Sequence, residues 1–197
     1  MTSEEIDAEI VDSAARLFAR HGYRQTSLQV IADEVGYSKT GLLHRFSSKE
    51  GLWEVVVTDF RTQIATVLDA ASTLPLGQAR DRAVVDAVLD VAARRPGLVR
   101  LMFSLLTLPE DDPDAALLQE APRVLLAAFG AAPGPDASDV TLDVTLDIDD
   151  AVEHDPARAV PLVGALGVLA VSTLLLEKHR QARPLVVQAA MRALGHP

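Results

Sequence analysis

The chain has 197 residues, of which 49% are hydrophobic and 4% aromatic, with a formal net charge of −10 and no cysteine. This composition indicates a soluble protein of one domain or two small ones, with an aliphatic core. It excludes disulfides and metal sites built on thiolates. The first residues, MTSEEIDAEIVD, lack the basic start and apolar core of a signal peptide, so we expect a cytoplasmic protein.

Charge is unevenly distributed along the chain. Residues 13–49 carry six basic and two acidic side chains, a net charge of +4, whereas residues 51–197 carry 12 basic and 20 acidic side chains. A basic island on an acidic body favours an anionic partner for the island. Chance clustering on a solvated surface is the alternative, which charge alone does not exclude.

The N-terminal segment predicts a first helix followed by a second one. Thr2 and Glu5 have the spacing of a capping box, and an apolar face repeats at helical spacing until Gly22, which can stop the helix. Thr26 and Gln29 repeat the capping-box spacing at the start of the second helix.

A third, shorter helix and a long fourth one follow. Gly36 ends the second helix, and Ser38 has the place of an N-cap for a helix that runs to Phe46. Ser47 and Glu50 then form a third capping box, which opens a long amphipathic helix. We therefore place a small three-helix domain at residues 1–47 and a larger domain at residues 48–197.

The larger domain is also predicted to be helical. Proline and glycine break the periodic pattern at residues 75–77, 96–97 and 183–184, with an acidic loop at 109–114 and a linker at 130–139. The helices between these breaks are expected at residues 80–94, 98–108, 115–129, 157–179 and 185–194.

Two segments allow more than one interpretation. Residues 140–148 alternate apolar and polar side chains at the period of a strand, and we favour an extended lead-in over an edge strand. Residues 160–176 contain no charge, but they include a proline and two glycines. We expect a helix buried in a core or a subunit interface rather than a membrane span.

The second and third helices, joined by a glycine turn, have the pattern of a helix-turn-helix. Such a motif places its second helix in the major groove of DNA. Leu42 and Phe46 are four residues apart and face the core, which leaves polar and cationic side chains on the other face. The candidate DNA-binding residues are Thr26, Ser27, Ser38, Lys39, Thr40, Gly41, Leu43, His44, Arg45 and Lys49.

These residue types suit a duplex. Lys and Arg can donate to guanine, Thr or Leu can contact a thymine methyl group, and the hydroxyls and free amides of Thr26 and Ser27 can hold a phosphate. Gly41 removes a side chain where the backbone approaches DNA. A helix pair of this kind can also be a plain packing unit.

The stretch TSLQVIADEVGYSKTGLLHRFSSKEGLW, residues 26–53, resembles the N-terminal signature of TetR-family transcriptional regulators. The resemblance implies an all-α homodimer, with a helix-turn-helix DNA-binding domain and a helical-bundle domain for ligand binding and dimerisation. It also implies a repressor that a small-molecule effector, here of apolar character, releases from a palindromic operator.

The resemblance further implies an effector pocket and a dimer interface in the larger domain. Candidate pocket residues are Trp53, Phe60, Leu101, Met102, Phe103, Leu106 and Phe129, and each of them could equally be plain core. Candidate interface residues are Gly164, Leu166, Gly167, Leu169, Ala170, Leu174 and Leu175.

One departure concerns the third helix. The family often has a tyrosine at the position of Leu43, where it contacts a phosphate, and leucine cannot make this contact. Arg45 could supply the missing contact with the DNA backbone, which is a hypothesis that its replacement by alanine tests.

No pattern of an enzyme is present. The sequence shows no phosphate-binding loop, dinucleotide motif or catalytic triad, and its acidic run at residues 147–155 fits neither calcium nor zinc spacing. We expect no cofactor and no metal. The alternative to a regulator is a helical small-molecule-binding or protein-interaction module that has lost specific DNA binding.

Overall fold

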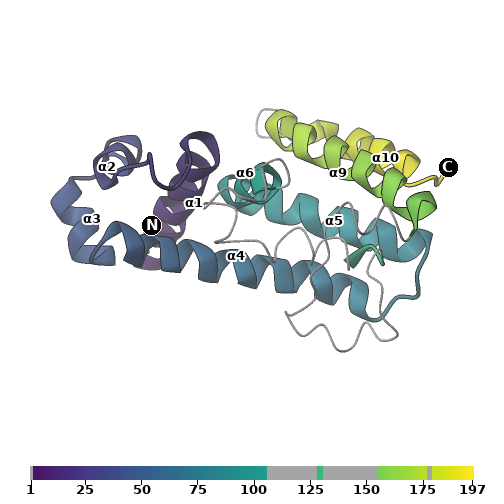
Figure 1. Ribbon diagram of the computed structural model, residues 1–197, viewed down its shortest axis with the longest axis horizontal. Coiled ribbons are helices and arrows are strands. Elements are labelled where there is room, and N and C mark those ends of the chain that lie inside the picture. Colours follow the sequence, from purple (N-terminus) through teal and green to yellow (C-terminus); the bar gives the residue numbers. More distant parts are fainter. Residues whose placement is uncertain (1, 106–127, 131–154, 177–178) are drawn as a thin grey trace. The chain divides into compact units, whose positions relative to one another are not determined.

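The computed structural model describes residues 2–105, 128–130, 155–176 and 179–197. Every regular element in these ranges is a helix (Figure 1), which confirms the all-α fold class. The chain divides into two compact units, one of residues 1–62 and 95–118 and the other of residues 63–94 and 119–197. Helix α4 (Lys49–Ser72) contributes to both, and the predicted domain boundary at residue 47 stays a prediction.

The N-terminal unit is built from α1 (Ser3–His21), α2 (Leu28–Val35), α3 (Lys39–Phe46), the first part of α4 and α6 (Pro96–Leu105). Helix α1 packs on both α2 and α6, and α2 packs on α3. The predicted apolar stripes meet in one core, whose most buried large side chains are Ile10, Ile31, Leu42, Leu52 and Leu98.

Short-range caps hold the helix ends of this unit, and two of them differ from the prediction by one residue. The capping box of Thr2 and Glu5 is present. The second helix is capped by Ser27, whose side chain accepts a hydrogen bond from the Val30 amide at 3.3 Å, and not by Thr26.

The third predicted capping box was also wrong by one residue. Ser48, not Ser47, accepts a hydrogen bond from the Gly51 amide at 3.0 Å at the start of α4. Ser47 instead ends α3 with a φ of 65°, a left-handed conformation that non-glycine residues rarely adopt. Ser47 thus ends α3 and Ser48 caps α4, and the sequence does not distinguish the two serines because their side chains are identical.

Helix α6 begins at Pro96, where the sequence predicted a break. Proline fits the first turn of a helix because its missing amide would have no partner there. The amides of Gly97 and Leu98 donate to Oδ1 of Asp12 in α1, at 2.9 and 3.2 Å. Burial raises the pKa of Asp12, although these two hydrogen bonds and the nearby arginines Arg95 and Arg16 oppose the effect.

The C-terminal unit contains α5 (Gln78–Arg94), α9 (Pro156–Leu176), the short 3-10 helix η2 (Arg180–Ala182) and α10 (Arg183–Ala193). Helices α9 and α10 pack side by side, and both contact α5 (Figure 1). The predicted break at Arg183 and Pro184 is instead the first turn of α10.

A buried carboxylate joins three parts of this unit. Asp81 of α5 is fully buried and accepts hydrogen bonds from Arg158 of α9 at 2.6 Å and from His196 at 2.7 Å. The same nitrogen of Arg158 donates to the carbonyl of Phe129 at 2.6 Å, and Nε of the buried Arg80 donates to the carbonyl of Ala128 at 2.8 Å. Residues 128–130 are therefore held by two arginines.

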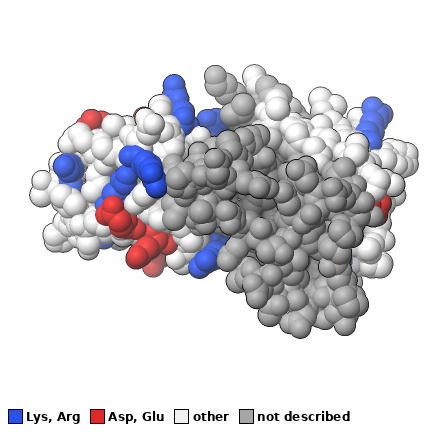
Figure 2. All heavy atoms as spheres, in the orientation of Figure 1, with Lys and Arg blue, Asp and Glu red and all other residues white. Residues whose placement is uncertain are grey.

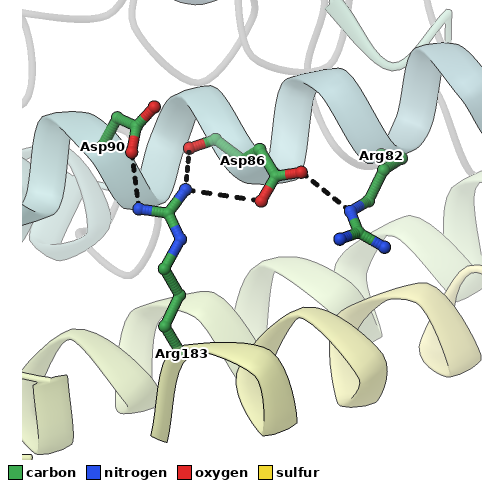
Figure 3. A network of polar contacts seen from close by, with 4 residues as sticks. All are labelled: Arg82, Asp86, Asp90 and Arg183. Atoms are coloured by element: carbon green, nitrogen blue, oxygen red, sulfur yellow. Dashed lines mark hydrogen bonds and ion pairs between the residues drawn. The ribbon is translucent and has the colours of Figure 1, made fainter. Parts of the chain in front are cut away.

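A second, more exposed network fixes the start of α10 on α5 (Figure 3). The guanidinium of Arg183 donates to Asp90 at 2.5 Å and to the backbone and side chain of Asp86, while Arg82 pairs with Asp86 from the same helix at 2.7 Å. Burial alone would lower the pKa of Arg183, but the hydrogen bonds and charges of Asp90 and Asp86 raise it.

Helix α9 is long and apolar enough to cross a membrane by length and composition alone. One side of it is buried in the C-terminal unit, through Ala159, Leu162, Ala165, Leu166 and Leu169. This burial is typical of a core helix in a globular protein. The segment at residues 140–148, with its two interpretations, lies outside the described residues.

Candidate nucleic-acid interface

Helix α3 presents one face to solvent and the other to the core. Leu42 and Phe46 are 0% and 8% exposed and anchor the helix. The exposed face of α3 comprises Lys39, Thr40, Leu43 and His44, which form two pairs of positions four residues apart. It offers a cation, a hydroxyl, an apolar group and an imidazole, which are the groups that contact base edges and methyl groups in a major groove.

Two serines that cap α2 and α3 bear on phosphate binding. Ser27 and Ser38 are exposed N-caps, and their oxygens accept from the amides of Val30 and Gly41 at 3.3 and 3.0 Å. Each hydroxyl keeps its own hydrogen for donation. A phosphate oxygen could accept it at the positive end of the helix dipole.

Gly41 lies close to the N-cap Ser38 within the protein. A Cβ atom at this position would lie 3.2 Å from Oγ of Ser38 and 3.8 Å from the ring of Tyr37. The absence of a side chain therefore leaves room for the Ser38 cap within the protein. Tyr37 is itself 38% exposed beside α3, and the sequence analysis did not identify it. Its place directly before an N-cap serine is the signal that could have found it.

Thr26 was proposed as a phosphate contact, and its placement contradicts this role. The side chain is only 2% exposed, and its hydroxyl donates to the Gly22 carbonyl at 2.8 Å. Thr26 thus ties the start of the second helix to the end of the first. Its hydroxyl is not available to a phosphate because it is turned into the protein.

Lys49 also makes internal contacts. Its ammonium group donates to the carbonyl of Tyr23 at 2.9 Å and lies 4.1 Å from the centre of the Tyr23 ring. A phosphate would share this ammonium group with Tyr23, so Lys49 stays a prediction. Hydrogen bonds from the backbone and from Ser48 lower the pKa of the neighbouring Glu50.

Arg45 points toward α1. Its Nε is ion-paired with Asp7, and its Nη2 donates to the side chain and the carbonyl of Ser3 at 2.6 and 3.3 Å. In addition, Arg16 pairs with Glu34 at 2.9 Å. Arg45 and Arg16 are thus each paired with a carboxylate, and acidic and basic side chains lie close together on the face of the molecule drawn in Figure 2.

The predicted effector-pocket residues are not brought together in one described unit. Trp53 packs against the rings of Phe18 and Tyr23, with centroids 5.2 and 5.0 Å away, and its place in an effector pocket stays a prediction. Phe60, Leu101, Met102 and Phe103 are buried in the N-terminal unit, whereas Phe129 is buried in the C-terminal unit; Leu106 lies outside the described residues.

The predicted interface residues divide between two sides of α9. Leu166 and Leu169 are 3% and 0% exposed within the chain, so they belong to its core, and this corrects their assignment to the interface. Gly164 and Gly167 are exposed and Ala170 is half-buried; the side chains of Leu174 and Leu175 lie outside the described residues. The large apolar side chains exposed beside the glycines are Val160, Val163 and Val171.

Comparison with known proteins points to one family. The family model described as "Bacterial regulatory proteins, tetR family" matches residues 10–56, a range that extends from α1 into α4 and includes the exposed face of α3. The chain is 36% identical over 74 residues to the HTH-type transcriptional repressor KstR2 of Rhodococcus jostii, covering 34% of this chain and 36% of that protein.

A second repressor is similar in sequence, and a solved structure shares the fold. The chain is 33% identical over 60 residues to the HTH-type transcriptional repressor AcnR of Corynebacterium diphtheriae, covering 30% of this chain and 32% of that protein. The matched segments therefore span about a third of these relatives. A TetR-like transcriptional regulator from Rhodococcus sp. RHA1 shares the fold over the full length of both chains, with 19% identity and a TM-score of 0.57. Residues 10–56 of the chain thus match the TetR family of bacterial regulatory proteins, and two curated repressors are similar to the chain over about a third of their length.

Proposed function

We propose that this protein is a cytoplasmic transcriptional regulator that binds double-stranded DNA through α3. The observation that carries the proposal is the exposed face of α3, which the buried Leu42 and Phe46 hold outward and which follows the exposed N-cap Ser38. Residues 10–56, which match the family model, include this face. The function is regulatory rather than catalytic.

The test is selection of bound DNA from random-sequence duplexes. We expect the protein to enrich an inverted repeat, because a two-fold dimer presents α3 to two half-sites. The Lys39→Ala variant should lose enrichment while its helical content stays that of the wild type, since Lys39 is exposed and outside the core. No enrichment by the wild type would instead favour a helical module that has lost specific DNA binding.

The proposal includes a homodimer formed through α9 and α10. The exposed stripe of α9 consists of small and β-branched residues at helical spacing, namely Val160, Val163, Gly164, Gly167 and Val171. Leu185 of α10 is 67% exposed. Small residues let two helices approach closely, and the valines supply apolar area to the contact.

Sedimentation of wild-type and variant protein tests the dimer. The wild type should sediment as a dimer at micromolar concentration, and Val171→Asp should shift it toward monomer because the charge would be buried. Val55→Asp, a change at another exposed valine, is the matched control. A monomeric wild type would contradict the proposed homodimer but not the all-α fold.

The proposal also includes control by an effector: a small, apolar molecule binds the repressor and releases it from DNA. It is supported by the apolar character of α6, which buries Leu101, Met102 and Phe103. Once an operator is selected, candidate molecules can be screened for release of the protein from that DNA. If every molecule that binds the protein leaves DNA affinity unchanged, effector control is wrong and DNA binding stands.

A further inference from the structure

Arg45 of α3 contacts α1, so a structural role of this side chain can be tested separately from a contact with DNA. The guanidinium group contacts two residues of α1 that precede it by 38 and 42 positions in the sequence. Its side chain is 26% exposed, and that of its partner Asp7 is 39% exposed. Three of its contacts are to α1: the Asp7 carboxylate, the Ser3 hydroxyl and the Ser3 carbonyl.

Helix α3 has few other anchors. It is eight residues long, and only Leu42 and Phe46 are buried. These two residues lie on one line along the helix, because they are four positions apart. A single line of apolar contacts permits rocking about that line, and a side contact from Arg45 to α1 opposes such motion. The rigid fork of the guanidinium suits this task, since it holds two partners at once.

We propose that Arg45 is a positioning residue, which fixes the orientation of α3 through Ser3 and Asp7 rather than donating to the DNA backbone. The proposal rests on DNA binding by α3 for its functional consequence. It assigns to α1 a part in recognition, because the exposed face of α3 is then aimed by the first turns of α1. It also reverses the hypothesis that Arg45 supplies the phosphate contact that Leu43 cannot make.

The two roles predict opposite effects of removing Asp7. If Arg45 serves a phosphate and Asp7 merely competes for it, Asp7→Asn removes an anion and frees a cation, so DNA affinity rises and its salt dependence steepens. If Arg45 positions α3, the same change loosens the helix and affinity falls. Glu9→Gln is the matched control, because Glu9 is an exposed acid of the same helix and the change removes the same charge.

The experiment measures affinity for the selected duplex as a function of salt in Asp7→Asn, Arg45→Ala, Glu9→Gln and the double variant Asp7→Arg with Arg45→Asp. We expect a three- to tenfold loss, on the order expected for a networked ion pair, in the first two variants, with a salt slope like that of the wild type. The double variant should recover part of the loss, although it places an acid on α3. A slope lower by about one for each phosphate that is no longer bound, with no recovery in the double variant, would overturn the proposal.

Amide hydrogen exchange without DNA gives an independent readout. Exchange in residues 42–46 should accelerate in Arg45→Ala and Asp7→Asn and remain as in the wild type in Glu9→Gln and the double variant. Should the wild type select no DNA, the proposed function fails, and this comparison still decides whether Arg45 positions α3. Unchanged exchange in all variants would show that it does not.

Discussion

Both units combine local caps with long-range polar contacts, and they differ in how individual helices start. In the N-terminal unit, Thr2, Ser27 and Ser38 each cap a helix by accepting from an amide three residues away. In the C-terminal unit, α10 begins without a side-chain cap, and ion pairs between residues 77 to 115 positions apart tie it and α9 to α5. Local caps fix where a helix starts, whereas long-range pairs fix which helices lie together.

The largest expected effect is in the C-terminal unit. Asp81→Ala should lower the free energy of unfolding by about 3 kcal/mol or more, because Arg158 and His196 would lose a fully buried partner. Denaturant unfolding measures the loss. Asp90→Ala is the matched control on the same helix, and it should cost less than about 1 kcal/mol because that carboxylate is 53% exposed. Equal losses would refute the importance assigned to the buried pair.

A close approach in the N-terminal unit predicts the next effect. A Cβ atom on Gly97 would lie 1.9 Å from the backbone oxygen of Asp12, so Gly97→Ala must separate α1 from α6. We expect a loss of about 2 kcal/mol, as for overpacked cores. Hydrogen exchange should accelerate in α1 and α6 but not in α10. Tolerance of alanine at this position would mean that the two helices are less closely packed.

Adjacent serines test the local caps. Ser48→Ala should cost about 1 kcal/mol because the Gly51 amide loses its acceptor. Ser47→Gly should instead stabilise the protein by up to about 1 kcal/mol, since glycine adopts the positive φ of this position without strain. Thermal unfolding of the two variants decides the assignment. If the signs were reversed, the sequence-based choice of Ser47 as the cap would be right.

The smallest expected effect is a pH dependence from Asp12. Because burial raises its pKa in the folded chain, the folded state binds more protons than the unfolded state between the two pKa values. Its contribution to stability is therefore full below the unfolded pKa and is lost as pH rises through the folded one. Asp12→Asn keeps an acceptor for the amides of Gly97 and Leu98 and removes the charge.

This variant should flatten the pH profile of stability between the ordinary pKa of an aspartate and the raised pKa of Asp12 in the folded chain, with a change smaller than that of a lost cap, below about 1 kcal/mol. Unfolding midpoints at a series of pH values measure it, with Asp33→Asn, an exposed acid of α2, as the control. A profile like that of the wild type would show that Asp12 does not titrate differently on folding.

Much of the candidate site could be predicted because its signals are local. Gly36 ends α2 in the left-handed conformation, and Ser38 caps α3, as the sequence indicated. The inward direction of Leu42 and Phe46 followed from helical spacing alone. Exposure of Lys39, Thr40, Leu43 and His44 followed with it.

The sequence-based predictions were wrong where a side chain could contact either a local or a distant partner. Thr26 and Ser27 are neighbours of similar chemistry, and only packing shows that Thr26 turns inward to Gly22 while Ser27 caps. Leu166 and Leu169 were assigned to an interface because of their apolar character, which a core and an interface both require.

Local patterns were enough to predict most of the described helices, the turn between α2 and α3 and the exposed face of α3, because caps and helical periodicity act within a few residues. They could not predict that Arg45 faces Asp7 and Ser3, that Trp53 packs on Phe18, or that Asp81 joins α9 to the C-terminus. Such contacts join residues that are distant in the chain. Their free energy depends on burial and geometry, which no local pattern records.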